Sequence, residues 1–262
     1  MISPTQGCFT LRAGKVNSLT HVIDRSTFCS HGSSACTQHI ESSALPSLSF
    51  SFSSAIEPEL PAPNVTCVDP ATMAVRGLVG MRGMLYELVF RGFASEGGEV
   101  TCQDLGGNNA TLHITGGPQE AWVSWVGDTE YDMASGDVLH DFSFRGADPH
   151  AKLTSQVSLL SAMYEEVLKE HVTEYRRTLL DGFSLDLGQV PDFETPTDEL
   201  IKAYTVDGGD VYVEWLLFNY GRYLLASSAK GTLPANLQGI WADGYENAWG
   251  AGKYDLLRIT PR

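Results

Sequence analysis

Apolar and polar residues alternate along the middle of the chain. The clearest run covers residues 84–90, where every second residue is apolar or aromatic, and residues 111–115 and 121–126 form two further short runs. A period of two places alternate side chains on opposite faces of a strand. Glycine-rich turns separate the runs. Short strands at such spacing predict an antiparallel β-sandwich, of which residues 71–150 would form a part.

A helical period replaces this alternation after residue 150. Apolar residues recur at steps of three or four over residues 151–181, which predicts one amphipathic helix ending at Gly182. Residues 183–187 then alternate again and predict a brief strand. We therefore assign residues 151–190 to a helical linker.

The last predicted domain covers residues 191–262. A helix is expected to start near Pro196, with Thr197 or Asp198 as its cap. The next helix, Val211–Ala229, is apolar or aromatic nearly all round, which predicts burial in a larger helical assembly. The 72 residues from 191 to 262 suffice for about three helices.

The first part of the chain, residues 1–70, predicts little regular structure. Serine, threonine and proline dominate it, and such a segment buries too little apolar surface to offset the entropy of ordering it. Phe50 and Phe52 alternate with serine and predict a single strand. No apolar run of about 7–15 residues follows Met1, so the N-terminus does not predict a secretory signal.

The charge balance restricts the partners. The chain has 17 lysines and arginines and 32 acidic residues, which gives a net charge of −15. Because nucleic-acid binding depends on cationic contacts to phosphate, a nucleic-acid partner is not expected, and a neutral polar substrate fits better. No stretch of about 18 apolar residues occurs, so a membrane-spanning helix is not expected either.

The cysteines predict no metal site, because none forms a C-x-x-C pair. No cofactor is predicted. Cys67 and Cys102 are placed either to form one disulfide or to stay reduced, and their spacing does not decide between the two. Asn64 and Asn109 each begin an Asn-x-Thr tripeptide, which is a glycosylation acceptor if the chain enters a secretory route. The five cysteines are Cys8, Cys29, Cys36, Cys67 and Cys102.

A cluster of acidic residues has the composition of a calcium loop but not its spacing. An EF-hand loop starting at Asp128 needs glycine at its sixth position and glutamate at its twelfth, where Met133 and Leu139 stand. We therefore expect a solvated turn. No set of catalytic or metal-binding residues accompanies His113 or His171 in the sequence. We therefore expect both to be packed histidines. The acidic cluster comprises Asp128, Glu130, Asp132 and Asp137.

Amide and indole side chains gather between residues 212 and 249. Such groups suit sugar hydroxyls and sugar rings, but they also serve to satisfy a loop backbone and to pack a core. Glycoside hydrolysis generally needs two carboxyl groups, about 6.5–9.5 Å apart for inversion. The nearby carboxylates Glu214, Asp243 and Glu246 show no such pairing, so we expect structural roles for them. The candidate sugar contacts are Asn236, Gln238, Trp241 and Trp249.

Seven collinear blocks between Met73 and Ala251 closely resemble α-L-fucosidases of glycoside hydrolase family 95. The resemblance implies an N-terminal β-sandwich, a helical linker, an (α/α)6 barrel and a small C-terminal β domain. It further implies inverting release of L-fucose from fucosylated oligosaccharides or polysaccharides. The blocks are residues 83–87, 122–127, 131–133, 142–146, 148–150, 196–198 and 212–249.

The resemblance ends before the catalytic motif of the family. There, the tryptophan-rich loop runs into D-Y-H-x-N-I-N-L-Q-M-N-Y-W, whose asparagines, with a later aspartate, activate water, while a later glutamate is the acid. Residues 250–257 of this chain read GAGKYDLL instead, so no catalytic residue is assigned. We expect an incomplete and inactive fragment of the enzyme. The alternatives are a non-catalytic carbohydrate-binding or structural sandwich protein, or a truncated product without function.

Overall fold

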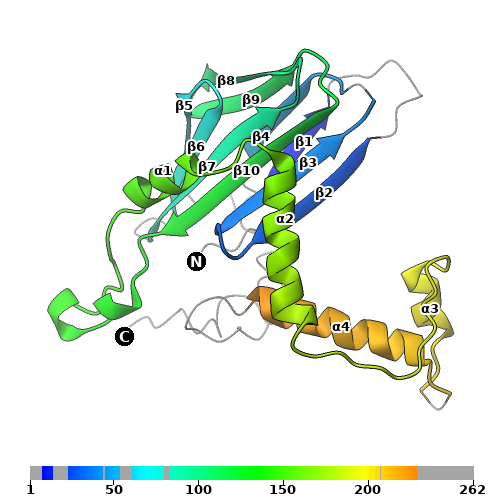
Figure 1. Ribbon diagram of the computed structural model, residues 1–262. Helices are drawn as coiled ribbons and strands as arrows, with labels where there is room; N and C mark the ends of the chain where they lie inside the picture. The colour runs from blue at the N-terminus through cyan, green and yellow to red at the C-terminus, as the bar shows by residue number, and fades with distance from the viewer. Residues whose placement is uncertain are drawn as a thin grey trace. The chain divides into compact units, whose positions relative to one another are not determined.

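The computed structural model describes residues 8–13, 23–43, 45–53, 61–79, 83–206 and 208–228. The chain divides into two compact units between His171 and Val172, inside one helix. The first unit holds two antiparallel β-sheets and the second holds helices (Figure 1). The prediction of an antiparallel β-sandwich followed by helices is thereby confirmed. The (α/α)6 barrel stays a prediction.

Within the described residues, ten strands form the two sheets, and every pair of neighbouring strands is antiparallel. In order across the larger sheet lie β2 (Asp24–Ser30), β3 (Ala35–Glu41), β10 (Glu120–Thr129), β7 (Leu85–Ala94), β6 (Thr72–Leu78) and β5 (Asn64–Asp69). In order across the smaller sheet lie β1 (Cys8–Ala13), β4 (Leu48–Ser53), β9 (Asn109–Thr115) and β8 (Glu99–Gly106).

The core lies between the two sheets. Phe50 and Leu112 of the smaller sheet pack in one cluster with Met73, Val75 and Val123 of the larger one, and all five are fully buried. Alternate residues of β7 lie on opposite faces of the sheet, as the sequence predicts. Its even-numbered residues face this core, whereas Val89 faces the other way, against Leu153 and Val157. Both faces of the larger sheet are therefore covered in its middle.

The expectation for residues 1–70 was wrong where the structure describes them. Strands β2 to β5 lie there, and Ile40, Leu48 and Phe50 are buried in the core. The segment is rich in serine, but in β4 the serines alternate with apolar residues that face inward. Its apolar residues complete a core whose other half comes from later strands, so the composition of the segment alone underestimates the surface it buries. The sandwich thus reaches from residue 8 to residue 129, and not only over 71–150.

The edges of the two sheets are joined on one side. A disulfide links Cys67 of β5 to Cys102 of β8, which resolves the alternative that the sequence left open. Backbone bonds strengthen the same junction, from the Val65 amide to the Asn108 carbonyl at 3.0 Å and from the Cys102 amide to the Pro70 carbonyl at 2.6 Å. A second disulfide, which the sequence did not predict, links Cys29 of β2 to Cys36 of β3.

The predicted helix over 151–181 is divided in two. Helix α1 (His150–Ser158) is followed by α2 (Tyr164–Tyr175) and a π-helical turn, η4 (Arg176–Leu180). Ser161 accounts for the start of α2, because its hydroxyl accepts from the Met163 amide at 3.1 Å and donates to Glu166 at 2.6 Å. The brief strand predicted at 183–187 is not formed.

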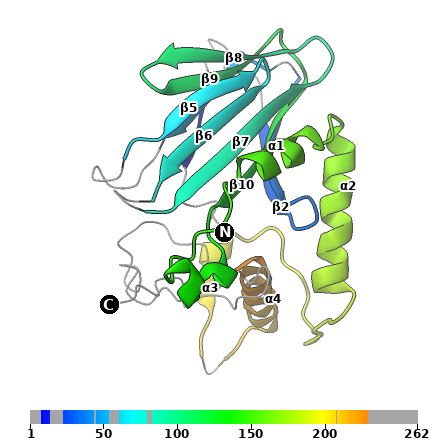
Figure 2. The ribbon, with the colours of Figure 1, turned by 90° about the vertical axis from the view of Figure 1, so that its left-hand side faces the viewer.

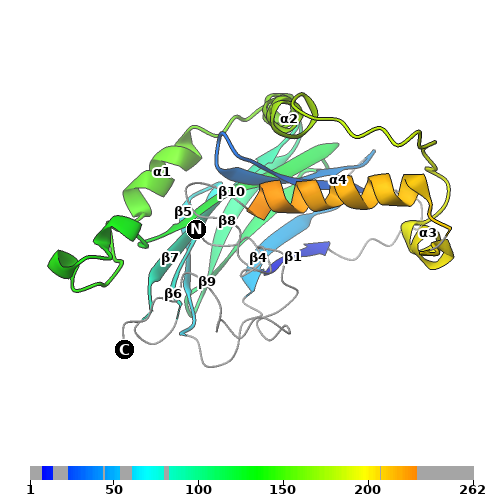
Figure 3. The same cartoon turned by 90° about the horizontal axis from the view of Figure 1, so that it is seen from below.

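Helices α1 and α2 begin on the outer face of the larger sheet. Helix α1 packs against β7 and β10 (Figure 2). Tyr164 of α2 stacks on His39 of β3 with ring centres 3.6 Å apart, and His171 stacks on Phe28 of β2 at 4.5 Å. Seen from below, both helices lie on the side of the larger sheet away from β4 and β9 (Figure 3). These contacts anchor α1 and the first part of α2, up to His171, on the sandwich.

The second unit contains α3 (Thr197–Ala203) and α4 (Val211–Ser228). Pro196 occupies the cap position of α3 without a side-chain bond, so neither predicted cap is used. Asp210 caps α4, because its carboxylate accepts from the amides of the next turn at 2.9 and 3.1 Å. None of the helices in the described residues is long and apolar enough to cross a membrane.

The described residues cover α4 only in part. Tyr212 and Val213 are buried, whereas several large apolar side chains are more than a third exposed. The predicted burial of the whole helix is therefore not seen within the described residues. The exposed residues are Leu217, Phe218, Tyr220, Tyr223 and Leu225.

Candidate functional site

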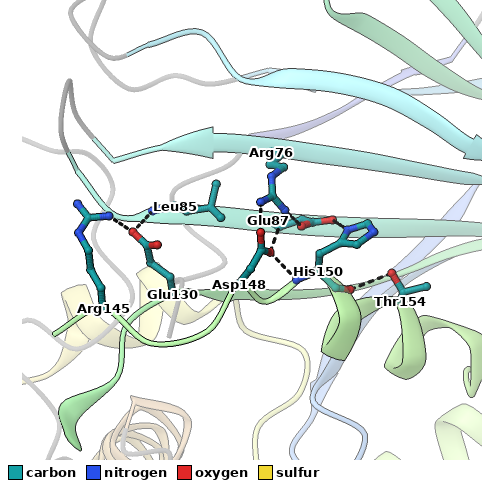
Figure 4. Close-up of polar contacts among 8 residues, drawn as sticks. All are labelled: Arg76, Leu85, Glu87, Glu130, Arg145, Asp148, His150 and Thr154. Carbon is teal, nitrogen blue, oxygen red and sulfur yellow. Dashed lines mark hydrogen bonds and ion pairs between the residues drawn. The ribbon is translucent and has the colours of Figure 1, made fainter. Parts of the chain in front are cut away.

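A network of charged residues joins the sandwich to α1 (Figure 4). Arg76 of β6 and Glu87 of β7 face each other across the ladder, with Arg76 Nη1 donating to Glu87 Oε2 at 2.5 Å. Nδ1 of His150, at the start of α1, lies 2.8 Å from the other Glu87 oxygen. The Glu87 side chain is only 1% exposed. The contacts with Arg76 and His150 therefore satisfy both oxygens of a buried carboxylate.

Asp148 completes this network from the loop before α1. Its carboxylate takes two hydrogen bonds from the Arg76 guanidinium and one from the His150 amide, the latter at 2.9 Å. The hydrogen bond from Arg76 is the main cause that lowers the pKa of Asp148 to about 2, and the same pairing raises the pKa of Arg76. A charged Asp148 therefore holds the first turn of α1 to the sheet.

A second ion pair joins the two ends of the loop segment that leads from β10 toward α1. Arg145 pairs with Glu130 and also donates to the Gly83 carbonyl at 3.0 Å. Glu130 accepts from the Leu85 amide at 3.0 Å, so both ends of this connection are attached to the start of β7. Two short 3-10 helices lie between them, η2 (Met133–Ser135) and η3 (Val138–His140).

The remaining acidic residues of the predicted turn serve the backbone and the surface. Asp132 accepts from the Ala134 amide at 2.9 Å and Asp137 from the His140 amide at 3.0 Å, which caps the two 3-10 helices. Asp128 pairs with Lys152 at 2.5 Å. Their carboxylates thus point to separate partners, and no three metal-binding side chains gather within the described ranges.

The charged network cannot supply a glycosidase with its two carboxyl groups. An inverting enzyme keeps them about 6.5–9.5 Å apart with space for the sugar and a water. Here Glu87 and Asp148 both bind the one guanidinium of Arg76, and Glu87 has no exposed oxygen to offer. We conclude that the network is structural. The network is not visible in the sequence, because the pairing of Arg76 with Glu87 depends on strand register. Glu87, Asp148 and His150 nevertheless lie in the blocks that resemble family 95.

The helical unit contains a small cavity of about 150 Å³. Ligand pockets usually measure about 300–1,000 Å³, so it is too small for an oligosaccharide. Its polar side chains form hydrogen bonds within the helical unit: Arg222 donates to the Leu179 carbonyl and to Asn219, and the Trp215 indole donates to the Leu185 carbonyl. Its lining residues are Tyr175, Leu179, Leu180, Trp215, Asn219 and Arg222.

Most of the predicted site lies outside the described residues. This applies to the four candidate sugar contacts, Asn236, Gln238, Trp241 and Trp249, and to the carboxylates Asp243 and Glu246.

Three other residues singled out from the sequence are described. Glu214 is exposed and accepts from the Tyr204 hydroxyl at 3.2 Å, which raises the pKa of Tyr204. This contact favours the structural role expected for Glu214. The two histidines are packed as predicted, with His113 bonded to Ser49 at 3.0 Å and His171 stacked on Phe28.

Two family models match the chain in tandem. The model for the glycosyl hydrolase family 65 N-terminal domain matches residues 12–134, which correspond to the sandwich. The model for the glycosyl hydrolase family 95 catalytic domain matches residues 163–256. The second match begins inside the range predicted as the linker and includes α2, α3 and α4.

Curated relatives carry fucosidase names. "Probable alpha-fucosidase A" of Aspergillus niger is 34% identical over 239 residues, which are 88% of this chain and 29% of that protein. Its namesake in Aspergillus oryzae is 31% identical over 243 residues, 87% of this chain and 31% of that protein. "Alpha-L-fucosidase 2" of Arabidopsis thaliana is 35% identical over 109 residues, 39% of this chain and 13% of that protein. The chain spans less than a third of the length of each of these relatives. Together with the family models, these relatives show that the chain belongs to glycoside hydrolase family 95, the α-L-fucosidase family.

Proposed function

We propose that the chain is the N-terminal part of an α-L-fucosidase that hydrolyses α-L-fucosides in glycans with inversion. One observation carries this proposal, the order of the two family matches along the chain. A sandwich domain followed by the start of a family 95 catalytic domain is the arrangement that the resemblance implies. The fucosidase names of the relatives support the substrate class, a fucosylated oligosaccharide or polysaccharide.

In this proposal, α3 and α4 are the first helices of an (α/α)6 barrel. The exposed apolar side chains of α4, such as Phe218 and Leu225, support this because such surface is normally covered in a complete domain. The sandwich then serves as a support whose own core is already closed. The ion pairs around Glu87 and Glu130 rigidify the connection that leads from the sandwich into α1.

Sugar binding is assigned to the segment that follows α4. Asn236 and Gln238 would hydrogen-bond the hydroxyl groups of fucose, while Trp241 and Trp249 would stack on its ring. No residue of the chain is assigned to acid or base catalysis. The 262 residues alone are therefore expected to bind weakly and not to hydrolyse.

An assay of the chain with 2′-fucosyllactose tests this function, with the Aspergillus niger relative as the active control. The expected result is L-fucose release by the control and none by the chain. Turnover above background would contradict the absence of catalytic residues. Calorimetry with L-fucose then separates the alternatives. Binding that is lost in Trp241→Ala but kept in a Trp122→Phe control places the sugar in the segment after α4. Binding that Trp241→Ala leaves unchanged favours a non-catalytic carbohydrate-binding sandwich, and no binding favours a product without function.

A further inference from the structure

Two Asn-x-Thr tripeptides lie next to each other at the junction of the two sheets. Asn64 is the first residue of β5 and Asn109 is the first residue of β9. The amide of Val65, inside the first tripeptide, donates to the carbonyl of Asn108, which immediately precedes the second, at 3.0 Å. Strands that are 45 residues apart in sequence thus bring both acceptor motifs to one rim of the sandwich.

Both asparagine side chains point outward. Asn64 and Asn109 are exposed, whereas the residue that follows each, Val65 or Ala110, is buried at 5% and 0% exposure. The pleat therefore sends the two side-chain amides to the solvent side while their neighbours face the core. A large hydrophilic group attached to either amide nitrogen would extend into solvent without displacing a packed side chain.

The disulfides indicate the compartment in which such a group is attached. Disulfides form and persist mainly in oxidising compartments, including the lumen of the endoplasmic reticulum, where Asn-x-Ser/Thr motifs are also glycosylated. The Cys67–Cys102 bridge lies on the same rim, with Cys67 directly after the first tripeptide and Cys102 on the strand paired with β9. Beside the two acceptor motifs, the same rim thus carries a disulfide, which is typical of an oxidising compartment.

We propose that Asn64 and Asn109 both carry N-linked glycans, which stand side by side on this rim. In the transfer, a bond forms between the Nδ2 atom of the asparagine and the anomeric carbon of an oligosaccharide. The bond from that carbon to the phosphate of a lipid-linked donor breaks, the lipid diphosphate leaves, and Nδ2 gives up one proton. The host oligosaccharyltransferase and its lipid-linked donor supply the reaction.

The two sites differ in how long they stay accessible. Thr66 is exposed in the folded sandwich, whereas Thr111 is 6% exposed and donates its hydroxyl to the Phe50 carbonyl at 3.2 Å. Since the transferase must engage the threonine of the motif, Asn109 has to be modified before β9 pairs with β4. Asn64 has no such limit. We therefore expect full occupancy at Asn64 and partial occupancy at Asn109.

Glycans at this rim would also protect the sandwich. Strands β5 and β8 are the edge strands of their sheets on this side, and the backbone groups of an edge strand that stay unpaired invite pairing with another chain. A hydrated glycan beside each edge blocks that approach. The rim that carries Asn64 and Asn109 then faces solvent in the whole protein and is not covered by another domain.

The test uses the full chain fused to a secretory leader and translated in the presence of endoplasmic-reticulum microsomes, so that occupancy is read without requiring a folded product. The expected wild-type pattern is a mixture of chains with two glycans and chains with the Asn64 glycan alone, and peptide-N-glycosidase removes all of these glycans. Asn64→Gln and Asn109→Gln are each expected to lose one glycan, and the double variant both. Thr66→Ala should lose the Asn64 glycan while its matched control, Thr66→Ser, keeps it. Glycopeptide mapping of protein from its native source is expected to show both sites modified.

Two results would overturn the proposal. One is a chain that is protected from added protease inside the microsomes but whose mass the glycosidase does not change. The other is native protein in which Cys67 and Cys102 are bridged while both asparagines are unmodified. Modification at Asn64 alone would refute the pairing of the two glycans on the rim.

Discussion

The sandwich and the helical unit of this chain differ in how far their own residues cover their apolar surface. The sandwich buries a cluster of fourteen core residues between two sheets and adds two disulfides and an ion pair with a buried carboxylate. In α4, by contrast, two residues are buried and several large apolar ones are exposed. The difference teaches that apolar content does not predict burial, because α4 is the more apolar segment and the serine-rich β4 is the better covered.

The largest expected loss of stability comes from a substitution in the centre of the sandwich core. Phe50→Ala removes a fully buried ring from the core and should lower the free energy of unfolding by about 4 kcal/mol. Leu225→Ala, at a residue that is 62% exposed, is the matched change in α4 and should cost less than about 0.5 kcal/mol. Chemical denaturation followed by circular dichroism measures both. Equal losses would mean that α4 is as well packed as the sandwich.

Removing the link between the sheet edges should have the next largest effect. The Cys67–Cys102 bridge spans 35 residues and the Cys29–Cys36 bridge spans 7. Because a longer loop loses more entropy on closure, the double serine variant of the first pair should cost about 4 kcal/mol and that of the second about 2 kcal/mol. Thermal unfolding of the two variants compares them directly. A larger loss for the shorter loop would contradict this explanation.

Neutralising the buried carboxylate tests the attachment of α1. Glu87→Gln removes the charge that binds Arg76 and His150, and it should lower stability by about 2 kcal/mol. The control is Asp198→Asn on α3, which breaks an exposed pair with Lys202 and should cost no more than about 0.5 kcal/mol. Urea denaturation measures both variants. Hydrogen exchange would then show faster opening of α1 in Glu87→Gln and no change there in the control.

The smallest effect is a pH dependence carried by Asp148. Its pKa is lowered from 3.8 to about 2 in the folded protein, mainly by Arg76, so the unfolded chain binds the proton more readily. The stabilisation is therefore complete above about pH 4 and is lost as the pH falls toward 2. Because Asp148 is half exposed, solvent screening keeps the effect small. The stability difference between wild type and Asp148→Asn should shrink over this range, and a constant difference would contradict the assignment.

Local patterns predicted much of the fold correctly. The alternation along 84–90 predicted which residues of β7 face the core, and the runs at 111–115 and 121–126 became β9 and β10. The helix beginning at Val211 was also confirmed over its described length, to Ser228. These features depend on the period of neighbouring residues, which is visible in any window of the sequence.

Contacts between distant strands escaped prediction. The composition of the serine-rich segment predicts little regular structure, yet its Phe50 lies in a strand that pairs with β9 more than 60 residues later. The helix break at 159–163 was missed because the capping bonds of Ser161 compete with a continuous apolar period. The blocks that resemble family 95 predicted the family correctly. The four candidate sugar contacts lie outside the described residues and stay a prediction.

The sequence by itself determined the family of this protein, the presence of strands in the middle of the chain and the apolar composition of α4. Each of these features depends on residue types at fixed local spacing. Only the tertiary structure decided which cysteines pair, that Glu87 is buried between Arg76 and His150, and that Asn64 and Asn109 share one rim. Each of these depends on the register and order of strands. That order is set by the burial of one common core, to which residues far apart in the chain contribute together.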